Sequence, residues 1–223
     1  MLLSITVTLL ATLSLSFKVL AASAAAPVAV KKGDVAAGEA QAVSCAACHG
    51  ADGNSPAPSF PKIAGLGEKY LTEQLKLIQS KERDIVEMTG LLDGKSEQDL
   101  KDLAAYFNSK TMQLSGAKPL EVRVNAGIKV DGLKLGARVF RAGNLQTGVP
   151  SCTGCHSPKG LGNDPAGYPR LSGQYSEYIA KQLRAYRAGE RTAGANSQIM
   201  RQVAEQMSDA EIDAVANYIS GLN

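Results

Sequence analysis

The chain has 223 residues, and its 24 lysines and arginines nearly balance its 21 aspartates and glutamates, for a formal net charge of +3. This balance argues against the strongly basic surfaces that bind nucleic acid or anionic lipid. The content of apolar residues (44%) and charged residues (20%) is that of a globular protein, long enough for one large domain or two small ones.

Residues 1–24 are predicted to be a secretory signal peptide. The stretch is apolar and rich in small residues, and residues 22–24 (A-S-A) form a suitable cleavage site. Two features depart from the usual pattern, because no basic residue precedes the apolar run and Lys18 interrupts it. An uncleaved anchor is the alternative, although the segment before Lys18 is at the short limit for a membrane span.

The rest of the sequence contains two copies of one unit. Matching residues recur in the same order in both copies. The number of positions between partners is nearly constant in the first part of the unit, as between Cys45 and Cys152, and larger in the last part, as between Ser96 and Ser208. The second copy therefore holds four extra residues between Arg191 and Ser208. This register indicates a tandem duplication. The matched stretches are SCAACHG with SCTGCHS (44–50 and 151–157), FPKIAG with YPRLSG (60–65 and 168–173), YLTEQLK with YIAKQLR (70–76 and 178–184), ER with ER (82–83 and 190–191) and SEQDLKDLAAYF with SDAEIDAVANYI (96–107 and 208–219).

Each copy is predicted to be all-α, with three or four short helices and a long loop. The last helix begins at a serine N-cap followed three residues later by an acidic residue, Ser96 with Asp99 and Ser208 with Glu211. Apolar residues then recur at helical spacing. A second helix contains YLTEQLK or YIAKQLR, and a loop rich in glycine and proline precedes it. Neither copy contains a run in which apolar and polar residues alternate as they do in a strand.

These features predict a first domain at 33–112, a linker at 113–131 and a second domain at 132–223. A helical unit of this size has a thin core, so its stability often depends on a covalent staple or a bound cofactor.

Each unit supplies a CxxCH motif, the attachment signature of c-type haem. Two thiols on one helical turn can add to the two vinyl groups of a porphyrin, and the next histidine then faces the iron. A disulfide framework and a zinc site are the alternatives, although zinc would lack an obvious fourth ligand. We therefore expect two covalently attached haem c groups. The predicted cofactor-binding residues are Cys45, Cys48, Cys152 and Cys155, and the predicted histidine ligands of iron are His49 and His156.

The second axial ligand of each iron is predicted to be methionine. The chain has only two histidines, so neither iron can take a second one, and methionine is the usual partner in electron-transfer cytochromes. Met88 and Met200 each precede a serine cap by eight residues, whereas Met207 aligns with Lys95 and Met112 has no counterpart. The repeat therefore favours Met88 and Met200 as ligands, with core filling as the alternative.

Two further pairs of residues recur in the repeat. Pro61 and Pro169 follow the CxxCH motifs and are candidates to offer a carbonyl to the second ring nitrogen of each histidine, although they could simply shape the loop. The matched tyrosines and glutamines of YLTEQLK and YIAKQLR are interpreted as packing and helix-surface residues.

Together these residues resemble the dihaem cytochrome c4 family. The resemblance covers nearly the whole chain after Gly33 and includes CAACHGADGNSPAPSFPKIAGLGEKYL, EMTGLL, CTGCHSPKGLGNDPAGYPRLSGQ and IMRQVA. It implies two class I cytochrome c domains related by a pseudo-twofold axis, with Met88 and Met200 as distal ligands. It also implies a periplasmic or membrane-associated carrier that passes electrons towards a terminal oxidase.

A six-coordinate His/Met iron has no open site for a substrate, so we expect an electron carrier rather than an enzyme. The alternatives are a dihaem enzyme of peroxidase-like or thiosulfate-oxidising type and a fixed haem subunit of an oxidase or dehydrogenase complex. The expected partners are redox proteins, and we expect a monomer. Lysines and arginines number 10 against 12 acidic residues in 25–112 but 13 against 9 in 113–223, an asymmetry that could orient partners or be ordinary variation.

Overall fold

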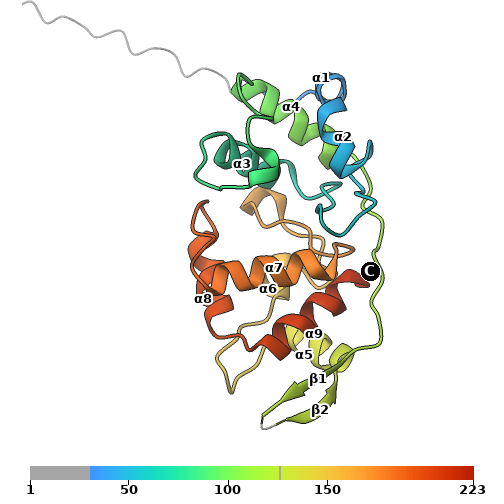
Figure 1. The fold of residues 1–223 in the computed structure, drawn as a ribbon, viewed down its shortest axis with the longest axis vertical. Helices are drawn as coiled ribbons and strands as arrows, with labels where there is room; N and C mark the ends of the chain where they lie inside the picture. The colour runs from blue at the N-terminus through green and yellow to red at the C-terminus, as the bar shows by residue number, and fades with distance from the viewer. Residues whose placement is uncertain (1–30, 126) are drawn as a thin grey trace, which may run out of the picture. The chain divides into compact units, whose positions relative to one another are not determined.

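The protein is described from a computed structural model that covers residues 31–125 and 127–223 (Figure 1). The predicted signal peptide lies outside the described residues. The all-α prediction is confirmed, since helices dominate both copies of the repeat. The first copy contains α1 (Val35–Gln41), α2 (Val43–His49), α3 (Glu68–Gln79), the 3-10 helix η1 (Val86–Met88) and α4 (Glu97–Asn108). The second contains α5 (Gly132–Ala142), α6 (Thr153–His156), η2 (Asp164–Ala166), α7 (Ser176–Arg187), α8 (Ser197–Glu205) and α9 (Asp209–Ser220).

In each copy the first helix crosses the last at a glycine. Helix α1 packs on α4, and α5 packs on α9. A Cβ atom at Gly38 would collide with the backbone carbonyl of Asp102, and one at Gly136 would collide with that of Ala214. The absence of a side chain at these two positions is therefore what lets the helix backbones approach so closely.

The apolar faces of these helices form one core cluster in each copy. In the first, Leu103 and Phe107 of α4 are 1% and 4% exposed and pack with Leu71 of α3. In the second, Phe140 of α5 and Ile212 of α9 are both fully buried. The helical spacing of apolar residues read from the sequence thus corresponds to the buried faces of α4 and α9.

The segment predicted as a linker contains a short hairpin that the sequence did not predict. Strands β1 (Glu121–Val124) and β2 (Ile128–Asp131) pair antiparallel, with Glu121 opposite Asp131. Each strand has only four residues, too few for alternation to stand out. The hairpin is anchored by Val122, which is 8% exposed, and β1 contacts α9.

The four extra residues of the second copy coincide with a change of structure. Met88 lies on the single turn η1, whereas Met200 lies on α8, a helix of nine residues. Helix α8 ends at Glu205, and α9 begins at Asp209.

Both predicted capping boxes are present, and they differ in burial. The carboxylate of Asp99 accepts the backbone N–H of Ser96 at 2.8 Å, and that of Glu211 accepts the backbone N–H of Ser208 at 2.9 Å. Glu211 is only 3% exposed and also accepts the side chain of Asn144 at 2.7 Å. Burial acts to raise the pKa of Glu211, but the hydrogen bonds from Asn144 and Ser208 outweigh it and the pKa is lowered.

Substitution Glu211→Ala is expected to lower the free energy of unfolding by about 2 kcal/mol, because it removes the buried half of a capping box and leaves the Asn144 amide without its acceptor. Asp99→Ala is the matched control and should cost less, since Asp99 is more exposed. A lowered pKa in the folded state stabilises the protein above the ordinary carboxyl value of 4.5. The difference between wild type and Glu211→Ala in urea unfolding should therefore shrink as pH falls below that value. Equal costs for the two substitutions would contradict this account.

Candidate functional site

The first CxxCH motif lies on α2. This helix carries Cys45, Cys48 and His49 within its seven residues and ends at Gly50, whose φ of 76° favours glycine. Cys45 packs against the first core cluster, and this burial raises the pKa of its thiol. The motif therefore sits on a rigid element with one thiol directed to the core.

The second motif lies on the shorter helix α6. Cys152 is the N-cap residue, and Cys155 and His156 lie on the helix itself. Ser157 takes the place of Gly50 and has a φ of 68°, the left-handed region that a serine rarely adopts. Cys152 packs against the second core cluster, and burial raises the pKa of its thiol to about 12. All four cysteines of the described chain are free.

Each histidine is held through one ring nitrogen. The Nδ1 atom of His49 lies 2.8 Å from the carbonyl oxygen of Pro61, and that of His156 lies 2.9 Å from the carbonyl oxygen of Pro169. The prediction that Pro61 and Pro169 offer their carbonyls to the histidine rings is confirmed. A carbonyl can only accept a hydrogen bond, so Nδ1 carries the proton and the lone pair of Nε2 is left for a metal.

Burial also favours the form of histidine that binds iron. It lowers the pKa of both His49 and His156 and outweighs the opposite effect of the carbonyl hydrogen bonds. The imidazoles are therefore neutral at physiological pH, and a neutral imidazole with a protonated Nδ1 fits an iron ligand that binds through Nε2.

The four methionines of the described chain fall into two classes. Met112 and Met207, which the repeat did not favour as ligands, are 3% and 4% exposed and belong to the two core clusters. Met88 and Met200 are only half-buried. Met200 packs against the same cluster as Cys152. Met88 is not part of the first cluster and borders a cavity of about 120 Å³. Their roles as ligands stay predictions.

A polar network that the sequence did not predict joins the two copies of the repeat. Two guanidinium groups, from Arg83 and Arg191, share two acceptors, the side-chain oxygens of Gln74 and Gln182. Arg191 is 9% exposed, and among the described residues neither arginine forms an ion pair with a carboxylate. The tyrosines and glutamines interpreted as packing and surface residues are these acceptors. The bonds are Arg83 to Gln74 (2.7 Å), Tyr178 (3.2 Å) and Gln182 (3.3 Å), and Arg191 to Gln182 (2.7 Å), Tyr70 (3.0 Å) and Gln74 (3.0 Å).

The network suits an anionic group. Burial would raise the pKa of Tyr70, but the charges of Arg191 and Arg83 outweigh it and lower the pKa. The Nε atom of Arg191 is buried with no hydrogen-bond partner among the described residues. A haem brings carboxylates as well as iron, so a positive cluster with a spare donor fits such a cofactor chemically.

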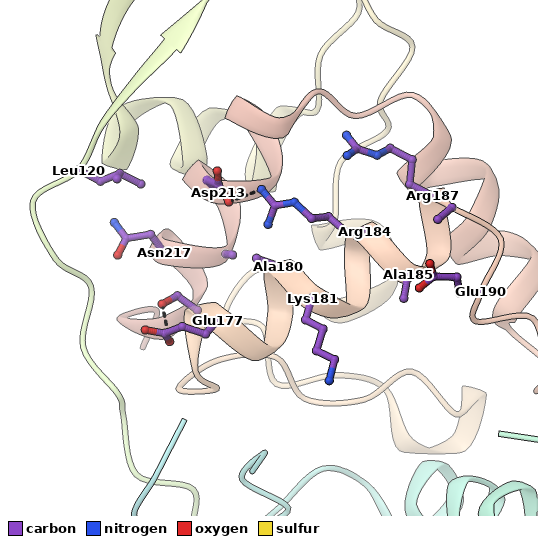
Figure 2. Close-up of a pocket in the computed structure, with 13 residues that line it drawn as sticks. Leu120, Glu177, Ala180, Lys181, Arg184, Ala185, Arg187, Glu190, Asp213 and Asn217 are labelled. Atoms are coloured by element: carbon purple, nitrogen blue, oxygen red, sulfur yellow. Dashed lines mark hydrogen bonds and ion pairs between the residues drawn. The ribbon is translucent and has the colours of Figure 1, made fainter. Parts of the chain in front are cut away.

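A groove of about 970 Å³ lies on α7 and α9 (Figure 2). Figure 2 shows Arg184 of α7 paired with Asp213 of α9, with Nη2 and Oδ1 2.7 Å apart. Its lining includes no cysteine, histidine or methionine. The groove therefore has no part in binding the iron.

Comparison with known proteins agrees with this geometry. The family model described as Cytochrome c matches residues 35–111 and 133–223. The chain is 48% identical over 191 residues to cytochrome c4 of Pseudomonas aeruginosa, covering 86% of this chain and 90% of that protein. It is 46% identical to the solved structure of reduced recombinant cytochrome c4 from Pseudomonas stutzeri, with a TM-score of 0.78 and coverage of 86% and 100%. A more distant relative is a thiosulfate dehydrogenase electron acceptor of Thiomonas intermedia, 35% identical over 83% of this chain and 81% of that protein.

The fold and the two motifs define a c-type cytochrome with two haem-binding units. The chain belongs to the cytochrome c family and, within it, to the dihaem cytochrome c4 family. Two covalently attached haem c groups and an electron-transfer role follow from this membership. Within the described residues, none of the helices is both long enough and apolar enough to span a membrane.

The shared acceptors of Arg83 and Arg191 predict energetic coupling between the two arginines. In a double-mutant cycle with Arg83→Met and Arg191→Met, followed by urea unfolding, the coupling energy should be about 0.5–3 kcal/mol. The control cycle pairs Arg191→Met with Arg123→Met in the hairpin, where Arg123 donates to Gly127, and should be additive. Additive costs for Arg83 and Arg191 would show that the network is not a unit.

Proposed function

We propose that this protein is a periplasmic carrier that passes single electrons between redox proteins of a respiratory chain, towards a terminal oxidase. The observation that carries the proposal is the repeated hydrogen bond between the CxxCH histidine and a proline carbonyl in both copies. The family membership and the resemblance of the sequence support the direction of transfer. Domains at 33–112 and 132–223, a linker at 113–131 and a cleaved segment at 1–24 complete the proposed organisation.

The proposed ligand set gives each iron two protein ligands. His49 and Met88 would hold the first iron, and His156 and Met200 the second, while the four cysteines would hold the porphyrins covalently. When bound, each haem stores and releases one electron by cycling between ferric and ferrous iron. The chain's own contribution is to orient each imidazole and to keep both sites away from bulk water.

This arrangement favours a carrier over an enzyme. The thioethers of Met88 and Met200 would stabilise ferrous iron and would leave no open site for a substrate. The two histidines of the chain are both used, which leaves no imidazole for acid-base chemistry on the distal side.

A second candidate concerns the donor. One relative is named a thiosulfate dehydrogenase electron acceptor, and it aligns with 83% of this chain. The same electron-transfer chemistry would then receive electrons from a thiosulfate-oxidising enzyme. Rapid reduction by such an enzyme with thiosulfate, set against slow reduction with a respiratory donor, would favour this candidate.

The ligand set is tested by near-infrared absorption of the oxidised protein, in which sulfur-to-iron charge transfer reports methionine ligation. We expect Met88→Leu and Met200→Leu each to remove about half of the band, since each would remove one thioether ligand of two. Met112→Leu and Met207→Leu are matched controls and should leave the band intact. An unchanged band in Met200→Leu would exclude that ligand.

The carrier function is tested in the same preparation. The wild-type protein should be reduced by a quinol-oxidising complex and reoxidised by a terminal oxidase, and it should show no turnover of peroxide. A wild-type protein that lacks the band and consumes peroxide would overturn the proposed function.

A further inference from the structure

The peptide unit that supports His49 is itself held from the other copy of the repeat. This unit joins the Pro61 carbonyl, which accepts His49 Nδ1, to the backbone N–H of Lys62. That N–H donates to the side-chain oxygen Oε1 of Gln174 at 3.0 Å. The Nε2 atom of Gln174 also donates to the carbonyl oxygen of Lys62 at 2.7 Å. The carboxamide of Gln174 thus binds both the backbone N–H and the backbone carbonyl of Lys62.

The clamp is buried. Gln174 is 3% exposed and Lys62 is 4% exposed, so water does not compete for these hydrogen bonds. The Oε1 atom also accepts the backbone N–H of Tyr175 at 3.0 Å, which fixes the orientation of the carboxamide. The Lys62 ammonium lies over the Tyr175 ring, 4.9 Å from its centre, and holds the same two segments together.

The second copy has an equivalent hydrogen bond, but its acceptor is a backbone carbonyl instead of a side chain. The peptide unit that supports His156 joins the Pro169 carbonyl to the backbone N–H of Arg170, and this N–H donates to the backbone carbonyl oxygen of Leu66 at 3.3 Å. Leu66 and Gln174 are equivalent positions, because each directly follows the matched stretch FPKIAG or YPRLSG. Each copy therefore supplies the acceptor for the other, by a side chain in one direction and by the backbone in the other.

We propose that Gln174 is a positioning residue that tunes the first haem from the second domain. An amide whose N–H is hydrogen-bonded is polarised, so its carbonyl oxygen becomes a stronger acceptor. A stronger bond from His49 Nδ1 to Pro61 makes the imidazole more electron-rich, which favours ferric iron. The inference rests on the proposed role of His49 as a ligand of the first iron.

The test replaces Gln174 by the residue found at the equivalent position, Gln174→Leu. The weakened Pro61 carbonyl should raise the ferrous-to-ferric ratio of the first haem at a fixed solution potential by roughly threefold, or about 30 mV at 59 mV per tenfold change. The second haem should be unaffected. A redox titration followed by NMR assigns each potential, because each histidine ring signal changes with its own iron.

The hydrogen bond itself is read from the ring N–H protons of the reduced protein. The chain has two histidines, and their signals are assigned through neighbouring rings, Phe60 for His49 and Tyr168 for His156. In Gln174→Leu the His49 signal should move upfield while the His156 signal stays. Gln174→Met keeps a similar side-chain length but removes both the donor and the acceptor of the clamp, so it should also move the His49 signal upfield. This variant also serves if Gln174→Leu fails to fold.

Asn217 provides the matched control. It is 7% exposed, and its carboxamide accepts the backbone N–H of Lys118 at 3.0 Å and donates to the Lys118 carbonyl at 2.8 Å. Asn217→Leu thus removes the same kind of clamp away from the histidine loops, and it should shift neither haem.

The proposal is overturned if both haems shift equally, if the His49 signal does not move, or if Asn217→Leu has the same effect. The near-infrared band separates this failure from that of the proposed function. An intact band with no shift rejects the tuning role alone, whereas a missing band in the wild type rejects the ligand set.

Discussion

Both haem sites depend on one hydrogen bond, from the histidine ring to a proline carbonyl. It fixes the tautomer and the orientation of the imidazole, and no other polar group of the described chain contacts either ring nitrogen. Pro61 follows His49 by 12 positions and Pro169 follows His156 by 13, yet the two hydrogen bonds have nearly the same length, 2.8 Å and 2.9 Å. The loop has therefore changed its length while the position of the carbonyl has been kept.

This constraint extends across the boundary between the copies of the repeat. The peptide units behind the two carbonyls are held by Gln174 and by the backbone of Leu66, each from the opposite copy. The arginine network adds reciprocal bonds between the two copies. The boundary thus contributes to the geometry of both sites, beyond burying apolar surface.

Local patterns predicted the parts of the structure that local physics determines. The capping boxes, the apolar faces of α4 and α9, and the carbonyls of Pro61 and Pro169 all follow from short-range spacing. The missed features depend on tertiary structure. The hairpin strands are too short to show a period. Gln174 and Arg191 look like surface residues in the sequence, because their hydrogen-bond partners lie in the other copy of the repeat. The repetition of Glu-Arg at 82–83 and 190–191 was a usable signal, because a guanidinium kept in register needs acceptors in register.

The two copies have diverged mainly on the side of the methionines. The imidazole supports are nearly identical, but Met88 lies on a single 3-10 turn beside a small cavity, whereas Met200 lies on α8 and packs against the core. A sulfur held by a packed helix has less freedom than one on a short turn, because core packing restricts its rotamers. The two copies also differ at Leu66 and its equivalent Gln174. Leu66 supports the opposite proline peptide unit through its backbone, whereas Gln174 does so through its side chain. The duplication has therefore kept the pairing of histidine with a proline carbonyl and altered the surroundings of the methionines and of the proline peptide units, so the two copies are not equivalent.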